Sequence, residues 1–375
     1  MDKNSSIFNF KSAFSPAFAM TVLLVFVIDA WVIPQIPNRI SFFFEQNNFD
    51  LPGRRDYEAL RAVLTYGPQM PVDVAILGSS RAREGVLAPH LKEQLNPHFK
   101  HDVKVAHYTI AASRVFEFEL LAQRLTDNQI LTPRVVVLPI NPRFLQSNAH
   151  RNHRRFYLMT PKHIMKDVGR FGLDSPLHLV EVLLSNTVNH TFALRYAARE
   201  WREGKATHTF APFESNPIFG GLGKYQAEEA VAKEAGTRIK SLDGFQLGKN
   251  GLDKYLHQEW PPGVTHLGEL EKEAFVTGLK TLRDHDVTVL ILDLPMSHIL
   301  EPAIPQEGLQ NYRNYLVTTA QELDVDLMGQ DDWPPFYPAE FREQSHLNLY
   351  GARKLTQFIA ERLLDHHRAQ LQGGF

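Results

Sequence analysis

A serine preceded closely by a glycine follows the first short apolar run that is typical of a strand. Residues 74–77 read Val-Ala-Ile-Leu and lead into Gly78-Ser79-Ser80. Such a run is typical of a strand buried on both faces, so Ser80 would lie in the turn at the carboxyl end of a strand. The turn would present its hydroxyl beside backbone N–H groups that can hold an oxyanion. Ser80 is thus a candidate nucleophile, although the same motif also occurs in ordinary turns and helix caps.

A carboxylate and a histidine stand three positions apart near the C-terminus. They are Glu343 and His346, and an amphipathic helical pattern follows them. Side chains at this spacing lie on the same side of a turn. The carboxylate can then orient the imidazole and stabilise its protonated form, as an acyl-transfer triad requires. Ser80, His346 and Glu343 are therefore the candidate catalytic residues, and Asp331 or Asp332 is an alternative source of the carboxylate.

Two further strand ends supply candidate oxyanion donors. Ala112 follows an apolar run at 103–106, and Asn141 follows one at 135–138. A small residue lets its backbone N–H approach an oxyanion, and an asparagine amide can donate a second hydrogen bond. Because chemistry in parallel sheets gathers at the carboxyl ends of the strands, we expect these donors beside Ser80.

Other polar residues near the same edge are candidates for substrate contacts. They are Ser79, Arg81, Arg143, His298 and Asn348. The two arginines would hold a carboxylate or phosphate on a polymer, or else form ion pairs across the loops. His150 and His153 lack nearby carboxylates at ligand spacing, so we expect no metal site there.

The spacing of apolar runs predicts an α/β fold. Runs typical of buried strands occur at 74–77, 103–106, 135–138 and 287–292, with helical patterns between them. Strands alternating with helices form a parallel sheet. Residues 145–270 break this rhythm, and we interpret them as a large, mostly helical insertion.

Composition excludes several classes of protein. The 375 residues are 43% hydrophobic and 22% charged, which is a globular balance. The 40 Lys and Arg against 42 Asp and Glu give a formal net charge of −2, which disfavours a nucleic-acid-binding surface. Cysteine is absent, which excludes disulfides, thiolate metal sites and cysteine nucleophiles. We expect no cofactor.

An apolar segment near the N-terminus predicts a membrane anchor. Residues 17–33 are almost wholly apolar and lie between Pro16 and Pro34, long enough to cross a bilayer core. A cleaved signal peptide is less well supported because small residues at a cleavage site are missing, and a buried core helix would be unusually apolar on all faces. Lys3 and Lys11 weakly favour a cytoplasmic N-terminus.

These blocks together resemble the SGNH hydrolases, also called GDSL-type esterases. The resemblance places Ser80 at the nucleophile position, Ala112 and Asn141 at the oxyanion positions, and Glu343 and His346 in the last block. Residues 76–86 (ILGSSRAREGV), residues 135–144 (VVVLPINPRF) and the region of His346 are similar to membrane-anchored SGNH-like proteins of bacterial envelopes. Some of those proteins work beside membrane-bound O-acyltransferases and acylate exopolysaccharides or teichoic acids.

The resemblance implies a domain organisation and a compartment. It implies a flavodoxin-like parallel sheet of about five strands with helices on both faces. The expected organisation is a cytoplasmic tail (1–14), a transmembrane signal anchor (15–36), a stalk (37–70) and an SGNH-like domain (71–375). The chain would be single-pass in the bacterial inner membrane, with its bulk periplasmic or otherwise extracytoplasmic.

The resemblance also implies a function. The activity would be that of an esterase or O-acyltransferase on an envelope glycan or polyol polymer, with a membrane-bound O-acyltransferase as the expected partner. Ser79, Ala112 and Glu343 depart from the Asp, Gly and Asp of the family's blocks. The alternative is therefore a catalytically silent binding or assembly protein. A weaker third hypothesis is a protein that handles a phosphate polymer through its arginines.

Overall fold

The computed structural model describes most of the chain from residue 72 onward, with four internal gaps. The described ranges are 72–110, 113–127, 132–146, 266–341 and 345–372, together with residues 20, 23 and 24. The predicted anchor (15–36) and stalk (37–70) therefore lie almost wholly outside the described residues. Among the residues described, no helix is both long and apolar enough to cross a membrane.

Five parallel strands form one sheet, as the predicted α/β fold requires. They are β1 (Val74–Gly78), β2 (Val105–Thr109), β3 (Val135–Ile140), β4 (Thr288–Asp293) and β5 (Asp326–Met328). The strand order is β2-β1-β3-β4-β5, and every neighbouring pair is parallel. This order is that of doubly wound sheets, whose ligand sites lie outside the carboxyl ends of the strands near β1 and β3.

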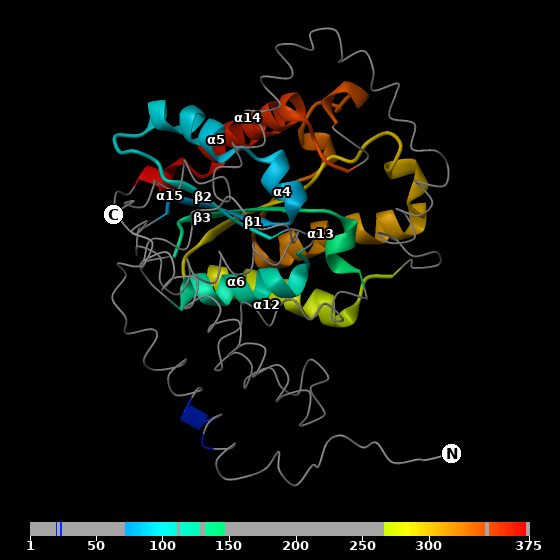
Figure 1. The fold of residues 1–375 in the computed structure, drawn as a ribbon, viewed down its shortest axis with the longest axis horizontal. Coiled ribbons are helices and arrows are strands. Elements are labelled where there is room, and N and C mark those ends of the chain that lie inside the picture. Colours follow the sequence, from blue (N-terminus) through cyan, green and yellow to red (C-terminus); the bar gives the residue numbers. More distant parts are fainter. Residues whose placement is uncertain are drawn as a thin grey trace, which may run out of the picture.

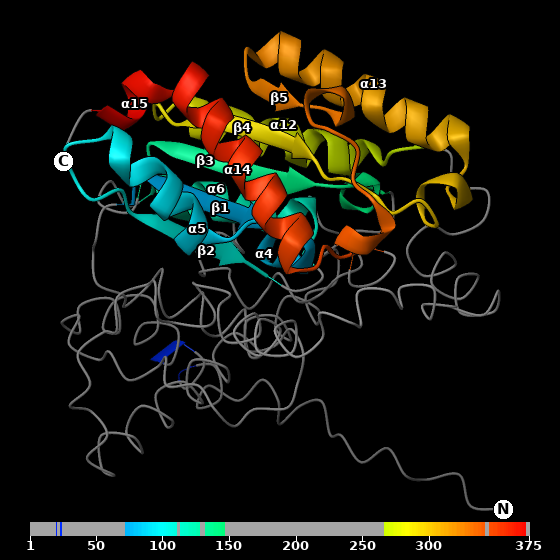
Figure 2. The ribbon, with the colours of Figure 1, turned by 90° about the horizontal axis from the view of Figure 1, so that it is seen from above.

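Helices cover both faces of the sheet (Figures 1 and 2). One face carries α4 (Ser80–Gly85), α5 (Ala88–Leu95), α14 (Leu349–His366) and α15 (Arg368–Gln372). The other carries α6 (Val115–Thr126), α12 (Glu269–Arg283) and α13 (Gln306–Leu323). Short 3-10 turns lie at Asn96–His98 (η4), Pro142–Leu145 (η5), Glu301–Ala303 (η10), Gln330–Asp332 (η11) and Pro338–Glu340 (η12).

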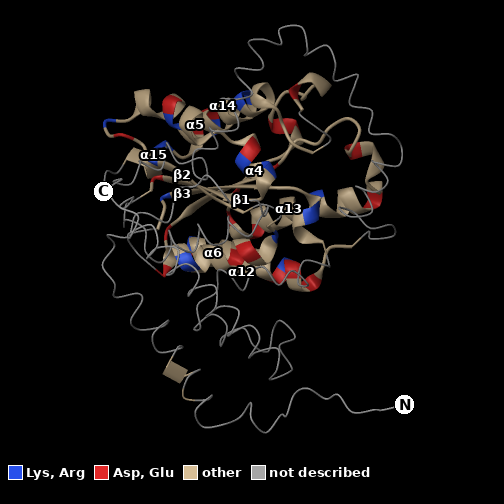
Figure 3. Cartoon of the chain, viewed as in Figure 1, with Lys and Arg blue, Asp and Glu red and all other residues tan. Residues whose placement is uncertain are grey.

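The strands form two separate cores because their side chains alternate between the faces. On β1, Ala75 and Leu77 pack with the α6, α12 and α13 layer, whereas Val74 and Ile76 pack with the α5 and α14 layer. All five residues of β1 are buried. A continuous apolar run in the sequence is therefore the signature of a strand covered on both sides. Charged residues lie mainly on the helices and loops, with both signs interspersed (Figure 3).

The predicted insertion at 145–270 is described only at its two ends. Gln146 and Leu267 form an antiparallel bridge, and the Gly268 N–H donates to the Leu145 carbonyl over 3.1 Å. The chain therefore leaves the sheet after η5 and returns to it at the same place, directly before α12. Residues 147–265, including the basic run at 150–155, lie outside the described residues.

Candidate active site

Ser80 is held at the carboxyl end of β1 by a sharp turn through Gly78. Gly78 has a φ of +136°, and a Cβ there would lie 2.8 Å from the Ala82 Cβ and 2.9 Å from the Pro139 carbonyl oxygen. Only glycine fits such a position without strain. The hydroxyl of Ser79 then caps α4 by accepting from the Arg81 N–H over 3.3 Å. Ser80 is thereby fixed as the first residue of α4, half-buried at the edge of the sheet.

His346 is fixed by a compact arrangement of residues 338–341 and 345–351, here called the histidine clasp. Phe341 and Leu347 form an antiparallel bridge, and the Asn348 N–H donates to the Glu340 carbonyl over 2.9 Å. Gly351 lies so close to Glu340 that a Cβ there would overlap the carbonyl oxygen. These contacts hold the start of α14 against the preceding loop and leave His346 little freedom to move.

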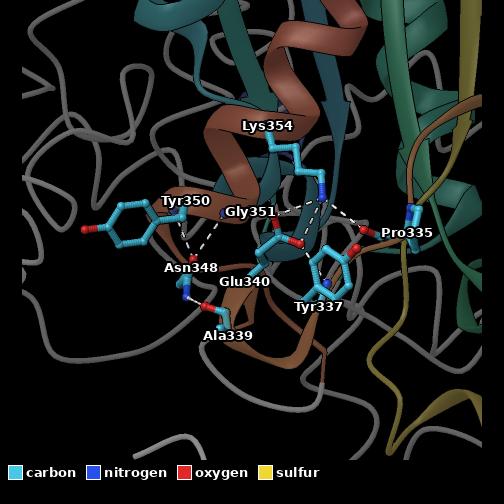
Figure 4. Close-up of polar contacts among 8 residues, drawn as sticks. All are labelled: Pro335, Tyr337, Ala339, Glu340, Asn348, Tyr350, Gly351 and Lys354. Carbon is cyan, nitrogen blue, oxygen red and sulfur yellow. Dashed lines mark hydrogen bonds and ion pairs between the residues drawn. The ribbon is translucent and has the colours of Figure 1, made fainter. Parts of the chain in front are cut away.

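Asn348 is central to the histidine clasp (Figure 4). Its Oδ1 accepts from the N–H groups of Tyr350 and Gly351 over 3.0 and 3.1 Å, which caps α14. Its Nδ2 donates to the Ala339 carbonyl over 2.6 Å. Both ends of the amide are thus occupied within the protein, so the geometry favours a structural role for Asn348 over the predicted substrate contact.

The structure brings together the predicted nucleophile and base across 266 positions of the sequence. The Ser80 Oγ lies 3.0 Å from the His346 Nε2, and the Ser345 Oγ lies 3.1 Å from the His346 Nδ1. For Nε2 to accept the serine proton, Nδ1 must carry the ring hydrogen and donate it. This geometry matches that of a nucleophile beside a general base, and a hydroxyl, not a carboxylate, is the partner of Nδ1 among the described residues.

Three carboxylates were candidates for the acid beside His346. Glu343 lies outside the described residues. Asp331 and Asp332 are exposed on η11. Asp332 accepts from the Gly329 N–H over 2.6 Å, and its charge raises the pKa of Arg362 after the larger effect of Asp326. Asp332 therefore stabilises its own turn.

The ends of β1, β2 and β3 meet beside Ser80. The Ile110 N–H donates to the Gly78 carbonyl over 2.8 Å, and Gly78 packs against Pro139. Asn141, two residues past Pro139, is buried, and its Oδ1 accepts from the Arg143 N–H over 3.1 Å. Its Nδ2 makes no hydrogen bond to the described residues and remains available as a donor. Ala112 lies outside the described residues.

The arginines at this edge of the sheet are partly buried and interact with other groups of the protein. Arg81 and Arg143 are half-buried and have interaction partners in the structure. Arg114, which the sequence analysis missed, donates from Nη1 to the Arg143 carbonyl over 3.4 Å. The sequence did give one signal for Arg114, which stands directly before the helical pattern that follows β2. His298 is exposed in the loop after β4.

A buried carboxyl group ends β4 near the same edge. Asp293 accepts from the Tyr312 hydroxyl over 3.1 Å, and its second oxygen lies 3.5 Å from the Arg313 Nε. Burial raises the pKa of Asp293 to about 6, although Arg313 and the Tyr312 hydrogen bond act in the opposite direction. The charge of Arg81 acts on Tyr312, which indicates that this cluster lies near the start of α4.

A buried histidine lies under α4. His107 is paired in register with Ile76 and so projects to the face of the sheet that α4 and α5 cover. Burial lowers the pKa of His107 to about 3, with the Arg83 charge as a further cause. The ring is therefore neutral at physiological pH, although a hydrogen bond with the Val86 backbone acts on the pKa in the opposite direction.

Comparisons with known proteins add no assignment. No protein-family model matches the chain, and no curated protein sequence matches it significantly. Any function must therefore be argued from the site itself. Within the described residues, no group of three or more metal-ligating side chains could hold a metal ion.

Proposed function

We propose that this chain is a serine-dependent acyl-ester enzyme of the SGNH type, an esterase or O-acyltransferase acting on an envelope glycan or polyol polymer. The observation that carries the proposal is the 3.0 Å contact between the Ser80 Oγ and the His346 Nε2. It lies at the carboxyl edge of a parallel sheet, where doubly wound folds place their chemistry. The block order that resembles the SGNH hydrolases supports the same reaction class.

Acylation begins when the Ser80 Oγ attacks the carbonyl carbon of an acyl ester. A bond forms between Oγ and the carbonyl carbon, and His346 Nε2 takes the serine proton. The oxyanion would be held by the Asn141 Nδ2 and by the Ser80 N–H at the start of α4, with Ala112 as a further donor. The bond to the leaving alkoxide then breaks, and the imidazolium returns its proton to that oxygen.

Deacylation repeats these steps with a second nucleophile. His346 takes a proton from water or from a sugar or polyol hydroxyl, and that oxygen attacks the carbonyl carbon of the acyl-serine. The bond between this carbon and the Ser80 Oγ then breaks, and the imidazolium of His346 returns its proton to Oγ. Water gives a free acid and makes the protein an esterase. A hydroxyl gives a new ester and makes it a transferase. Which acceptor is used depends on how well the site excludes water.

The remaining parts of the proposal concern residues outside the described ranges. Glu343 is proposed to supply the negative charge of the triad beside His346, whose Nδ1 contacts the Ser345 Oγ. Residues 15–36 are proposed to anchor the chain in the bacterial inner membrane, with its bulk extracytoplasmic. An enzyme so placed would receive acyl groups at the membrane, beside a membrane-bound O-acyltransferase.

Turnover of a small ester tests the proposal. With p-nitrophenyl acetate as substrate, Ser80→Ala should lower the rate by about 1,000-fold or more, because removal of a nucleophile removes the covalent route. Thr318→Ala removes a hydroxyl from the exposed side of α13 and serves as the control. Equal rates for Ser80→Ala and the wild-type protein would refute the assignment of Ser80.

The second candidate is a catalytically silent binding or assembly protein. It is favoured by the departures from the family's blocks at Ser79, Ala112 and Glu343. The change at Ser79 carries little weight, because its hydroxyl still accepts from the Arg81 N–H, as an aspartate would at a helix N-cap. A silent protein would hydrolyse no ester faster than Ser80→Ala does.

A further inference from the structure

Two exposed tyrosines flank the histidine clasp. Tyr337 is 61% exposed, and Tyr350 is 45% exposed. They are the only aromatic residues among the large, exposed apolar side chains of the described part of the chain. Tyr337 directly precedes η12, and Tyr350 lies in the first turn of α14, four residues after His346. The most exposed aromatic surface of the described domain is therefore attached to the segment that positions the candidate base.

Tyr337 is held in place although its ring is exposed. Its N–H donates to the Glu340 Oε2 over 2.7 Å, and the Lys354 Nζ binds both carboxylate oxygens of Glu340 over 3.0 and 3.1 Å. The Lys354 Nζ also donates to the Pro335 carbonyl over 2.9 Å and lies 5.2 Å from the centre of the Tyr337 ring. Figure 4 shows Lys354 reaching over this loop from α14.

Tyr350 is fixed from the other side of the histidine clasp. Its N–H donates to the Asn348 Oδ1 over 3.0 Å, while the Asn348 Nδ2 donates to the Ala339 carbonyl. Asn348 thus ties the backbone that carries Tyr350 to the loop that carries Tyr337. Figure 4 shows the two rings on opposite sides of these Asn348 hydrogen bonds. Both rings are therefore presented on one ordered support.

The local charge narrows the kind of ligand that these rings would accept. Lys354 and Glu340 form an ion pair, so the charges of these two side chains cancel, and the exposed Arg353 lies three residues after Tyr350 on α14. Phenol rings offer an apolar face and a polar edge, and exposed aromatic groups of this kind mark interaction sites. A pyranose ring matches them, since it has C–H faces and hydroxyl edges.

We propose that Tyr337 and Tyr350 form a subsite for neutral sugar rings of the acceptor glycan, beside the Ser80–His346 pair. This inference rests on the proposed function for the identity of the acceptor, and it names the residues that would bind the acceptor. The rings would stack on sugars next to the one whose hydroxyl reacts.

Direct binding to the full-length Ser80→Ala protein in mild detergent tests the subsite, because it needs no turnover. The probes are cellohexaose and chitohexaose, with hexamannuronate as an acidic comparison, measured by isothermal titration calorimetry. We expect a neutral hexasaccharide to bind and Tyr337→Ala or Tyr350→Ala to weaken it by about tenfold, the effect of removing one well-packed aromatic contact. Tyr337→Phe should retain most of the affinity because it keeps the ring.

Val317→Ala is the control, since it removes an exposed apolar side chain from α13. The inference is overturned if neither neutral hexasaccharide binds, if binding is unchanged in both alanine variants, or if only hexamannuronate binds. Thermal unfolding of each variant shows whether it is folded. If an alanine variant is not folded, Tyr337→Phe still tests whether binding depends on the ring.

The subsite and the proposed function fail in different ways. If small-ester turnover does not depend on Ser80 while sugar binding depends on the tyrosines, the enzyme assignment fails and the subsite stands. If turnover depends on Ser80 while sugar binding does not depend on the tyrosines, the subsite fails and the enzyme assignment stands.

Discussion

Gly351→Ala should displace the candidate base without touching any reacting group. A Cβ at position 351 would overlap the Glu340 carbonyl oxygen and lie 2.9 Å from the Leu347 Cδ2. Backbone at both positions is fixed by the Asn348 N–H bond to the same Glu340 carbonyl. The first turn of α14 must therefore move away from residues 338–341, and His346, which lies between them in the sequence, must move with it.

The size of the effect follows from the overlap. Relieving it requires a shift on the order of 1 Å, and overpacking of this kind costs ~1–3 kcal/mol of stability. For a domain of this size, that corresponds to a fall in Tm of roughly 3–10 °C. A displacement of 1 Å between a nucleophile and its base lowers a rate by up to about 100-fold. Gly351→Ala should therefore lose far more activity than its fraction of unfolded protein explains.

The assay compares Tm and p-nitrophenyl acetate turnover at 20 °C for Gly351→Ala and Gly329→Ala. A Cβ at Gly329 would only touch the Asp332 carboxylate at 3.7 Å, an ordinary contact, so this variant is the matched control. We expect near wild-type behaviour for Gly329→Ala and losses in both quantities for Gly351→Ala. If the two variants have the same turnover, the histidine clasp does not position His346 as argued.

Three further predictions concern single side chains. Asn141→Ser keeps an oxygen for the Arg143 N–H but removes the amide donor, so kcat should fall by ~100–1,000-fold; an unchanged kcat excludes Asn141 from the oxyanion site. Burial raises the pKa of Asp293 from 3.8 to about 6. As pH rises, this carboxyl loses its proton in the unfolded state before it does so in the native state, so the wild-type protein loses stability between about pH 4 and pH 6. The Tm of Asp293→Asn relative to wild type should therefore increase between pH 4 and pH 7, and a decrease would contradict this. The pKa of His107 is lowered to about 3 from 6.5, so the native protein loses stability as pH falls below 6.5, and His107→Gln should remove that loss in Tm.

Buried apolar strands were the most predictable part of the fold. The runs that became β1, β3 and β4 were evident because each strand is covered on both faces and is therefore apolar, apart from Thr288 and Asp293 at the two ends of β4. The strand predicted at 103–106 instead spans Val105–Thr109 in β2, because His107 and Thr109 are buried without apolar character. The edge strand β5 was not predicted, since Asp326–Met328 is too short and too exposed to produce a pattern.

The candidate site was predictable where a residue's place follows from a strand end. Ser80 and Asn141 belong to this group, because parallel strands deliver their carboxyl ends to one edge. The role of Asn348 was not predictable, since its two partners, the α14 N-terminus and the Ala339 carbonyl, are set by tertiary packing. The same holds for Asp293, whose raised pKa depends on burial under Tyr312 of α13.

Labelling with a serine-reactive fluorophosphonate tests the central claim most directly. The full-length protein is treated with the reagent, and the adduct is located by mass spectrometry in the wild type, in His346→Ala and in His285→Ala, which removes an exposed imidazole at the end of α12. An adduct on Ser80 in the wild type and in His285→Ala, but not in His346→Ala, is the result that an activated Ser80–His346 pair predicts. An adduct on another residue, or on Ser80 regardless of His346, or no adduct at all, would contradict it.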